Sequence, residues 1–450
     1  MTPRLTVQSD CLFTSIASNL EEELKTLLTI RNPKYIAAKR YGRWIGNKLK
    51  PQLKYYEQVE GGLRFPRGFS NQAVLACRKM CDLDPQIIDK RRLLPEVDLR
   101  FAGTLRPYQK AAVDAAENRS FGVVVAGTGS GKTVMALAIA VQRRQPTLVV
   151  VHSKELLYQW EERVYQFLGC KASLIGDGHF STGEVTIAIV NSARKRVKEL
   201  VPCFGHLVVD ECHRVPASLF TDVVSQFDCQ YLLGLSATAF RSDDESTKLI
   251  YFFMGDRIHS VDQGELKATG AILAPEVIRN TTSFTYAYRG DYQALIKALV
   301  AHEGRNTQIL KDIIKVVDGP EGGTVLVVSD RVKHCRFFVE KLKGRGVRVK
   351  LLCGKISQEK RNDVVEAVRK GEVQVLVATL QLIGEGFDCP GLSTLFLTTP
   401  ISFEGRLRQV IGRIMRPAAN KRARVFDYID ENVPALLRSA RARSAVLTEL

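Results

Sequence analysis

The sequence predicts an α/β protein with two lobes, each built on a doubly wound parallel sheet, and a small α+β module in front of them. Short apolar strands alternate with helical stretches over residues 101–240 and again over 324–429, which is typical of parallel sheets. A glycine-rich loop joins a strand to a helix early in the first block. The first hundred or so residues lack this alternation. We expect a basic N-terminal module at 1–98, a first lobe at 99–270, a linker at 271–320 and a second lobe at 321–450.

The N-terminal module contains a basic stretch, residues 31–54, with eight Lys or Arg residues and no acidic residue. Aromatic residues are interleaved with these cations. Basic groups can neutralise phosphates while rings stack on bases, so the stretch favours nucleic-acid binding. The alternative is a solvated basic face with aromatic side chains in the core. The candidate nucleic-acid contacts here are Lys39, Arg40, Arg43 and Trp44.

The first lobe opens with a strand over 121–125, a loop that ends in Lys132 and Thr133, and a helix over 134–141. This context is typical of a phosphate-binding loop. Glycines let backbone N–H groups surround phosphate oxygens, and the start of the helix adds positive charge at the same point. Lys132 can reach the β- and γ-phosphates, and the Thr133 hydroxyl can bind Mg²⁺. The predicted nucleotide-binding residues are Ala126, Gly127, Thr128, Gly129, Ser130, Gly131, Lys132 and Thr133.

Two adjacent carboxylates, Asp210 and Glu211, follow a further strand of the first lobe. Strands are expected over 147–152, 185–190, 206–210 and 231–236. A carboxylate at the carboxyl end of such a strand lies near the phosphate loop. We expect Asp210 to hold Mg²⁺ and Glu211 to orient and deprotonate the attacking water. The alternative is a helix N-terminus that favours acidic residues.

The second lobe has strands expected over 324–329, 347–352, 372–378, 394–398 and 424–429, and no phosphate loop of its own. The chain therefore binds one nucleotide. Arg413 and Arg416 are three residues apart, so we expect them to share one face of a helical turn. Guanidinium groups delivered to a γ-phosphate stabilise the transition state, which requires the two lobes to close on one ATP. The alternative is a basic helix on a nucleic-acid backbone or in solvent.

The charge of the chain points to a polyanionic partner. Its formal net charge is +17 over 450 residues, which favours nucleic acid, with an anionic membrane surface as the competitor. The sequence has no apolar run long enough to span a bilayer and no signal-peptide pattern at its start. We expect an intracellular protein without membrane contact, in the cytoplasm or, in a eukaryote, the nucleus. Ten scattered cysteines predict no zinc or iron–sulfur site.

The order of these segments resembles the superfamily 2 helicases and translocases of the DExH type, over about residues 101–430. The family motifs correspond here to Gln109, which contacts adenine, 126–133 (motif I), 150–160 (Ia), 210–213 (II), 236–238 (III), 327–331 (IV), 379–388 (V) and 409–416 (VI). The resemblance implies RecA-like lobes, ATP and Mg²⁺. It implies nucleotide contacts from Arg106, Gln109, Gly386 and Asp388, nucleic-acid contacts from His152, Ser153 and Thr379, and a role for Gln409 in placing the water.

Two further segments indicate a subfamily. Residues 234–238, 265–266 and 270–275 resemble the XPB-related group. Residues 40–46 resemble the small DNA-binding module of the UvsW phage helicases, which branch-migrate and unwind recombination and fork intermediates. We expect an ATP-dependent DNA helicase or translocase that acts on branched or forked DNA, with replication or recombination proteins as partners. Two alternatives stay open: an RNA helicase, and an ATP-gated clamp or motor subunit on duplex DNA that separates no strands.

Overall fold

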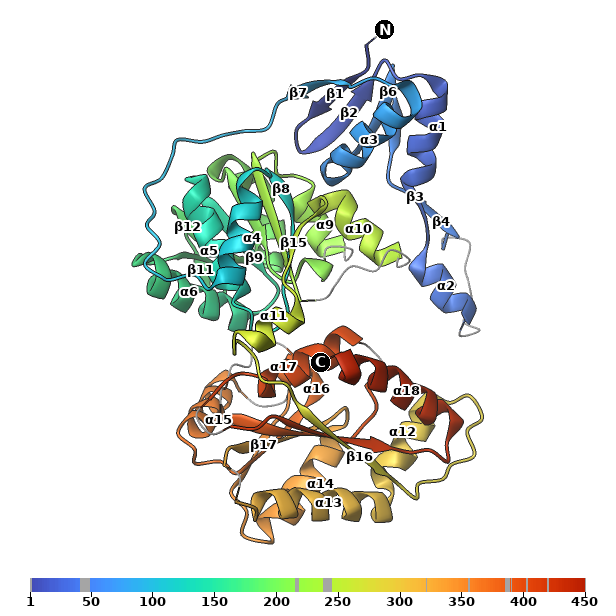
Figure 1. The fold of residues 1–450 in the computed structure, drawn as a ribbon, viewed down its shortest axis with the longest axis vertical. Helices are drawn as coiled ribbons and strands as arrows, with labels where there is room; N and C mark the ends of the chain where they lie inside the picture. Colours follow the sequence, from blue (N-terminus) through green and yellow to red (C-terminus); the bar gives the residue numbers. More distant parts are fainter. Residues whose placement is uncertain are drawn as a thin grey trace. The chain divides into compact units, whose positions relative to one another are not determined.

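A computed structural model describes residues 2–40, 49–214, 218–237, 245–320, 322–354, 357–384, 389, 391–401, 404–418 and 421–449. The chain divides into two compact units, residues 1–126 with 131–261 and residues 127–130 with 262–450. The first unit holds the N-terminal module and most of the first lobe, and the second holds the second lobe (Figure 1). Among the described helices, none combines the length and the apolar character that crossing a bilayer needs.

The N-terminal module is a mixed five-stranded sheet with two helices on it, which confirms the predicted α+β module. Its strands are β1 (Arg4–Val7), β2 (Asp10–Thr14), β5 (Glu57–Val59), β6 (Gly62–Pro66) and β7 (Gln86–Asp89), in the order β5-β6-β2-β1-β7. The helices are α1 (Ser18–Leu27) and α3 (Ser70–Cys81). A two-stranded sheet, β3 (Thr29–Arg31) with β4 (Gln52–Lys54), and helix α2 (Pro33–Arg40) carry the basic stretch. Alternate residues of β2, Cys11 and Phe13, are buried, as a sheet with one covered face requires.

The first lobe is built on an eight-stranded sheet in the order β11-β10-β12-β9-β13-β14-β8-β15, and all its pairs except β10–β11 are parallel. The strands are β8 (Phe121–Val125), β9 (Thr147–Val151), β10 (Ser173–Gly176), β11 (His179–Phe180), β12 (Val185–Ile189), β13 (His206–Val209), β14 (Tyr231–Ser236) and β15 (Arg257–Ser260). The helices are α4 (Pro107–Glu117), α5 (Lys132–Arg143), α6 (Lys154–Leu168), α7 (Val190–Lys195), α8 (Val197–Leu200), α9 (Ser218–Val224) and α10 (Glu245–Met254).

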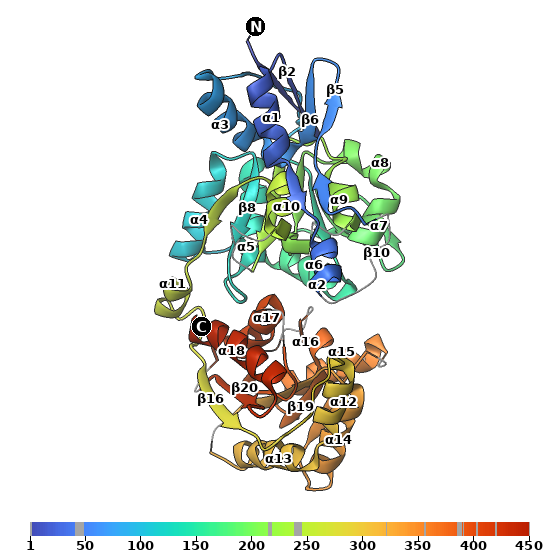
Figure 2. The same cartoon turned by 90° about the vertical axis from the view of Figure 1, so that its right-hand side faces the viewer.

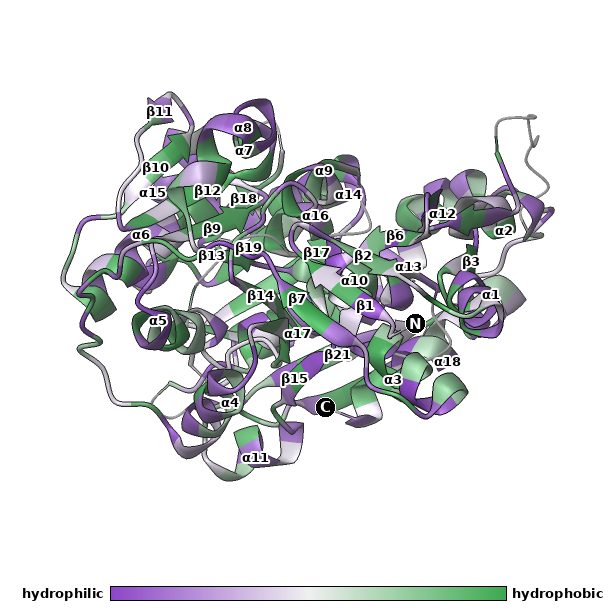
Figure 3. Cartoon of the chain, turned by 90° about the horizontal axis from the view of Figure 1, so that it is seen from above, coloured by the Kyte–Doolittle hydropathy of each residue, from purple (hydrophilic) through white to green (hydrophobic). Residues whose placement is uncertain are grey.

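Helices cover both faces of this sheet, with α5 on one side and α9 on the other (Figure 2). The central strands are therefore buried on both faces, and all five residues of β9 are apolar or buried threonine. Figure 3 shows the helices α3 and α4 with both hydrophilic and hydrophobic colouring, because each has one face on a sheet and one toward solvent. The parallel, doubly wound sheet predicted for this lobe is confirmed.

The second lobe has a six-stranded, all-parallel sheet in the order β16-β21-β20-β17-β19-β18. Its strands are β16 (Glu276–Thr281), β17 (Thr324–Ser329), β18 (Val349–Leu352), β19 (Val375–Thr379), β20 (Leu392–Leu397) and β21 (Arg424–Ile429). Its helices are α11 (Gln263–Ala268), α12 (Tyr292–Ala301), α13 (Glu303–Val317), α14 (Val332–Lys343), α15 (Gln358–Arg369), α16 (Leu380–Gly384), α17 (Glu404–Ile414) and α18 (Pro434–Glu449). Helices α13 and α14 cover one face, and α17 and α18 cover the other (Figures 1 and 2).

The prediction of a linker at 271–320 is wrong, because this segment contributes a strand and helices to the second lobe. Strand β16 pairs with β21 along its whole length and forms one edge of the second sheet. Helix α13 buries Ile309 and Ile313 in the core of the lobe, and its buried Arg305 donates from Nε to Oδ1 of Asp430 at 2.7 Å. The segment has the polar composition of a linker because an edge strand and a helix with one solvent-exposed face both expose polar residues.

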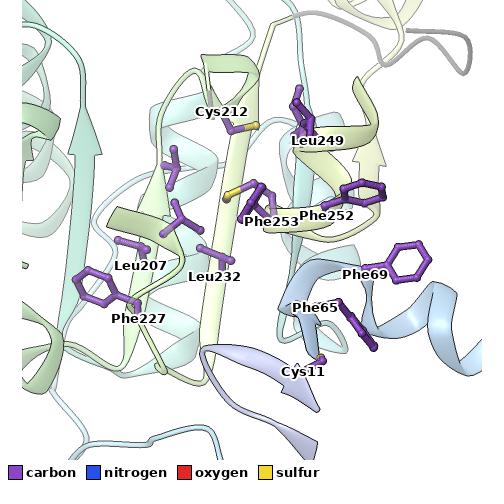
Figure 4. Close-up of a cluster of buried hydrophobic side chains, with 14 of the residues drawn as sticks. Cys11, Phe65, Phe69, Leu207, Cys212, Phe227, Leu232, Leu249, Phe252 and Phe253 are labelled. Atoms are coloured by element: carbon purple, nitrogen blue, oxygen red, sulfur yellow. The ribbon is translucent and has the colours of Figure 1, made fainter. Parts of the chain in front are cut away.

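The N-terminal module and the first lobe share one hydrophobic core (Figure 4). Phe69 of the module packs edge-on against Phe252 of α10, with ring centroids 5.4 Å apart. A Cβ on Gly68 would lie 2.4 Å from the carbonyl oxygen of Tyr251, so the two backbones touch there. Buried Arg67 donates from Nη1 to the carbonyl oxygen of Cys229 at 2.7 Å. The module is therefore part of the same folded body as the first lobe, whereas the sequence predicts two separate domains.

Candidate active site

The loop between β8 and α5 has the backbone geometry that phosphate binding needs. Gly129 and Gly131 have φ values of +88° and +82°, in the left-handed region that favours glycine. Gly131 is the N-cap residue of α5. A Cβ at Gly131 would lie 2.4 Å from Nε2 of Gln109, so a larger residue there would collide with that side chain. The residues present therefore fit a triphosphate held by backbone N–H groups at a helix N-terminus.

Lys132 lies between this loop and the two carboxylates. Its Nζ donates to the carbonyl oxygen of Ala126 at 3.1 Å. The same ammonium favours the charged forms of Asp210 and Glu211, which lowers the pKa of each. The structure thus brings together the lysine and the carboxylates that the sequence places almost eighty residues apart. A cation next to two carboxylates suits a site that takes both phosphate and a divalent metal.

Asp210 is a buried carboxylate with two fixed donors. Its Oδ2 accepts from Nε1 of Trp160 at 2.9 Å, and its Oδ1 accepts from the backbone N–H of Glu211 at 2.9 Å. Burial raises the pKa of Asp210 above its ordinary value, and the charge of Glu211 adds to this. The hydrogen bond from Trp160 and the charge of Lys132 act in the opposite direction. These donors fix both oxygens, and each oxygen keeps a further lone pair with which a carboxylate can bind Mg²⁺.

Glu211 is held in a strained conformation next to a histidine. Its φ is +51°, which is uncommon for a residue with a side chain and is a feature of functional positions. Oε2 of Glu211 lies 3.2 Å from Nδ1 of His213. Burial alone raises the pKa of Glu211, but His213, Lys132 and His152 together lower it below the ordinary value. Glu211 is therefore a charged carboxylate, as a base for water must be.

Gln109 lies beside the phosphate loop, as the adenine-contact prediction requires. Its Oε1 accepts from the backbone N–H of Arg106 at 2.9 Å, at the start of α4. This hydrogen bond fixes the carboxamide, and its Nε2 faces Gly131. The N-terminus of α4 and the phosphate loop are thus adjacent, although Gln109 and Gly131 are 22 positions apart in the sequence.

Two side chains of the segment 150–160 act on the carboxylates of the site, which the sequence does not predict. Trp160 has only 2% of its surface exposed and donates its indole N–H to Asp210. Both ring nitrogens of His152 are shielded from solvent, and its charge acts on Glu211. The Ser153 hydroxyl accepts from the backbone N–H of Leu156 at 3.4 Å and caps α6. Sequence reasoning assigns no role of their own to Trp160 and His213, although both lie in segments that it singles out, 150–160 and 210–213. No local signal shows that the indole of Trp160 reaches Asp210.

In the second lobe, Gln409 and Arg413 lie on α17, and Arg416 lies beyond the end of this helix at Ile414. The expected shared helical face of Arg413 and Arg416 is therefore wrong, because the helix stops before Arg416. Nε of Arg413 donates to the carbonyl oxygen of Ile383 at 3.2 Å. Thr379 is buried at the carboxyl end of β19.

Several predicted residues fall outside the described part of the chain. These are Arg43, Trp44, Thr238, Gly386 and Asp388, together with the side chain of Arg40. Lys39 lies exposed on α2.

Comparison with known proteins supports the two-lobed organisation. The family "Type III restriction enzyme, res subunit" matches residues 102–241, and the family "Helicase conserved C-terminal domain" matches residues 305–418. The DNA 3'-5' translocase XPB2 of Sulfurisphaera tokodaii is 24% identical over 438 residues, which cover 89% of this chain and 98% of the relative.

Two solved structures align with this chain. The structure of S. cerevisiae Dbp5 bound to RNA and ADP BeF3 aligns with 76% of this chain and 87% of that chain, with a TM-score of 0.55 and 16% identity. The crystal structure of T4 UvsW aligns with 100% of this chain and 97% of that chain, with a TM-score of 0.45 and 19% identity. With the phosphate loop, the paired carboxylates and the two helicase-family matches in one order along the chain, the protein belongs to superfamily 2 of the helicases and is an ATP hydrolase of that family.

Proposed function

We propose that this protein is an ATP-driven motor that translocates on DNA and unwinds or branch-migrates branched DNA. The observation that carries the proposal is the group formed by partly buried Lys132, buried Asp210 and partly buried Glu211, beside a glycine loop with the geometry of a phosphate cradle. These three groups match the three tasks of ATP hydrolysis, which are phosphate binding, metal binding and activation of water.

In the proposed mechanism, the N–H groups of residues 126–133 and the Lys132 ammonium bind the triphosphate. The Thr133 hydroxyl and Asp210 would hold Mg²⁺, which supplies charge neutralisation at the phosphates. Glu211 accepts a proton from the attacking water, and His213 keeps the carboxylate oriented and charged. Arg106 and Gln109 contact the base side of the nucleotide.

The second lobe completes this proposed site. Arg413 and Arg416 stabilise the negative charge that develops on the γ-phosphate, and Gln409 positions the water. Gly386 and Asp388 add nucleotide contacts. Closure of the lobes on ATP and opening after hydrolysis form a two-state cycle that the γ-phosphate biases, and repetition of the cycle moves the protein along a strand.

Three observations support a nucleic-acid partner, and the second of them favours DNA. The net charge of +17 favours a polyanion. A relative that aligns over nearly its whole length is named a DNA 3'-5' translocase. The basic stretch, with Lys39 exposed on α2, belongs to a module that shares its core with the first lobe. We infer that the module holds one arm of a branched substrate through Lys39, Arg40, Arg43 and Trp44, and that His152, Ser153 and Thr379 line the path of the strand.

The test is the ATPase rate with single-stranded DNA, duplex, fork, four-way junction and RNA, together with strand separation and branch migration on the same substrates. We expect the largest stimulation and strand movement with forks or junctions. Stimulation by RNA alone would contradict the proposal. Stimulation by duplex without strand separation or branch migration would identify a clamp or a motor subunit instead.

A further inference from the structure

The outer face of α14 in the second lobe carries a row of cations. The helix buries His334, Cys335, Phe338 and Leu342 against the sheet. The exposed basic residues on its other side and in the turn that follows are Lys333, Arg336, Lys341, Lys343 and Arg345. We call these five residues the α14 cationic surface. Glu340 is the one acidic residue of the helix.

These five cations lie close together in the sequence, and Glu340 is the one acidic residue among them. None of the five forms an ion pair with a residue that the structure describes. Elsewhere, Arg194 pairs with Asp222 and Arg196 pairs with Glu199. Uncompensated cations close together repel one another, so a polyanion that covers them gains free energy.

The neighbouring helix α13 extends the same layer. Ile313 of α13 and Phe338 of α14 lie in one core on the same face of the sheet, so the solvent sides of both helices form one outer surface. Lys311 and Lys315 of α13 are exposed. In the described part of the chain, neither lysine has an acidic side chain within ion-pairing distance.

This surface is distinct from the edge that bears the helicase motifs. Helix α14 starts three residues after the carboxyl end of β17, and the chain then enters β18, parallel to β17. A crossover helix between parallel strands runs back toward their amino ends. Lys341, Lys343 and Arg345 therefore lie toward the edge opposite to Thr379, which ends β19.

We propose that the α14 cationic surface binds the phosphate backbone of a DNA duplex, as a second arm of the substrate that the lobes act on. This inference rests on the proposed function. Helix α14 has 12 residues and is about 18 Å long, a length over which duplex DNA presents about ten phosphates. None of the large hydrophobic side chains that are exposed among the described residues lies between 331 and 350, so the surface offers nothing for a membrane or an apolar protein interface.

The test compares two triple variants of the full chain with equal loss of charge. The first is Lys341→Ala with Lys343→Ala and Arg345→Ala. The control is Arg194→Ala with Arg196→Ala and Lys370→Ala, which removes three cations that are all ion-paired. The affinity of each for a four-way junction and for a single-stranded oligonucleotide is measured over a range of salt concentrations.

We expect the slope of log affinity against log salt for the junction to fall by about 2.7 in the first variant, from three lost phosphate contacts at about 0.9 each. The control slope, and the affinity of both variants for the single strand, stay at the value of the unaltered protein. An unchanged junction slope in the first variant overturns the inference. The inference is also overturned if the first variant loses binding to phosphatidylserine vesicles or to polyglutamate while its junction slope stays unchanged. A third outcome separates the two proposals. If the first variant shows the expected fall in junction slope but the unaltered protein shows no DNA-stimulated ATPase, the proposed function is wrong and the DNA-binding role of the α14 cationic surface is retained.

Discussion

Nε1 of Trp160 donates to Oδ2 of Asp210 at 2.9 Å, and both side chains are buried. The indole fixes the carboxylate proposed to hold Mg²⁺ and favours its charged form against the effect of burial. A residue in the middle of α6 thereby reaches the end of β13, fifty residues further along the chain.

Trp160→Phe tests this relationship, because it keeps an aromatic ring and removes the N–H donor. Loss of a hydrogen bond to a charged group costs about 1.5–3 kcal/mol. We therefore expect the Mg²⁺ concentration that gives half-maximal ATP hydrolysis to rise about ten- to hundredfold, as measured in a Mg²⁺ titration. The control is Tyr165→Phe, an exposed position on the same helix. An unchanged Mg²⁺ dependence in Trp160→Phe would show that the indole is only packing.

Arg413→Ala tests the role proposed for the second lobe. An arginine that stabilises a γ-phosphate in the transition state contributes about 10³-fold or more to the rate of hydrolysis, and we expect a loss of that order with nucleotide binding retained. The matched control is Arg408→Ala on the same helix, where the guanidinium pairs with Glu404 and Glu449 instead. Equal rates of ATP hydrolysis for Arg413→Ala and the control would show that Arg413 does not stabilise the transition state.

Gly68→Ala tests the shared core. The added Cβ would lie 2.4 Å from backbone atoms at the end of α10, which are not free to move as a flexible side chain is. We expect a loss of about 1–3 kcal/mol in the free energy of unfolding of the first unit, measured by denaturant titration. The unaltered protein is the reference. If Gly68→Ala unfolds at the same denaturant concentration as the unaltered protein, the backbone of the module is not in tight contact with α10 at Gly68.

Substitutions in the basic stretch test the N-terminal module without removing it. Deletion of residues 1–95 would uncover the apolar face of α10, so its effects would mix folding with DNA binding. We expect Lys39→Ala combined with Arg43→Ala to weaken binding to a four-way junction and to leave the basal ATPase unchanged, as measured by fluorescence anisotropy and steady-state turnover. Lys79→Ala, an exposed lysine on α3 outside the stretch, is the comparison. Equal junction affinity in the two proteins would count against the module as a DNA-binding element.

The parts of the fold that the sequence predicts are those with strong local signals. Strands such as β9 and β17 are continuous apolar runs because both faces of a parallel sheet are covered. The phosphate loop is recognised from Gly129 and Gly131 because only glycine adopts that backbone freely. Polar edge elements are missed: β15 and β16 expose half of their residues and have no periodic apolar pattern.

The parts of the site that the sequence does not predict depend on contacts between distant residues. Nothing near Trp160 indicates that its indole reaches Asp210, because the contact exists only once α6 packs on the sheet. The apolar residues of α10, including Phe252, are compatible with any buried helix until Phe69 of the module is known to cover them. The end of α17 at Ile414 is the exception, because Pro417 is a local stop signal that disfavours the helical conformation at Arg416. The spacing of Arg413 and Arg416 alone does not take this proline into account.

The most direct measurement of the central claim is the ATPase rate of Lys132→Ala and Glu211→Gln with and without forked DNA, alongside their affinity for nucleotide and DNA. We predict that both variants lose DNA-stimulated hydrolysis by about a hundredfold or more while each still binds DNA, and that Glu211→Gln still binds ATP. Stimulated turnover at the rate of the unaltered protein in either variant would contradict the account.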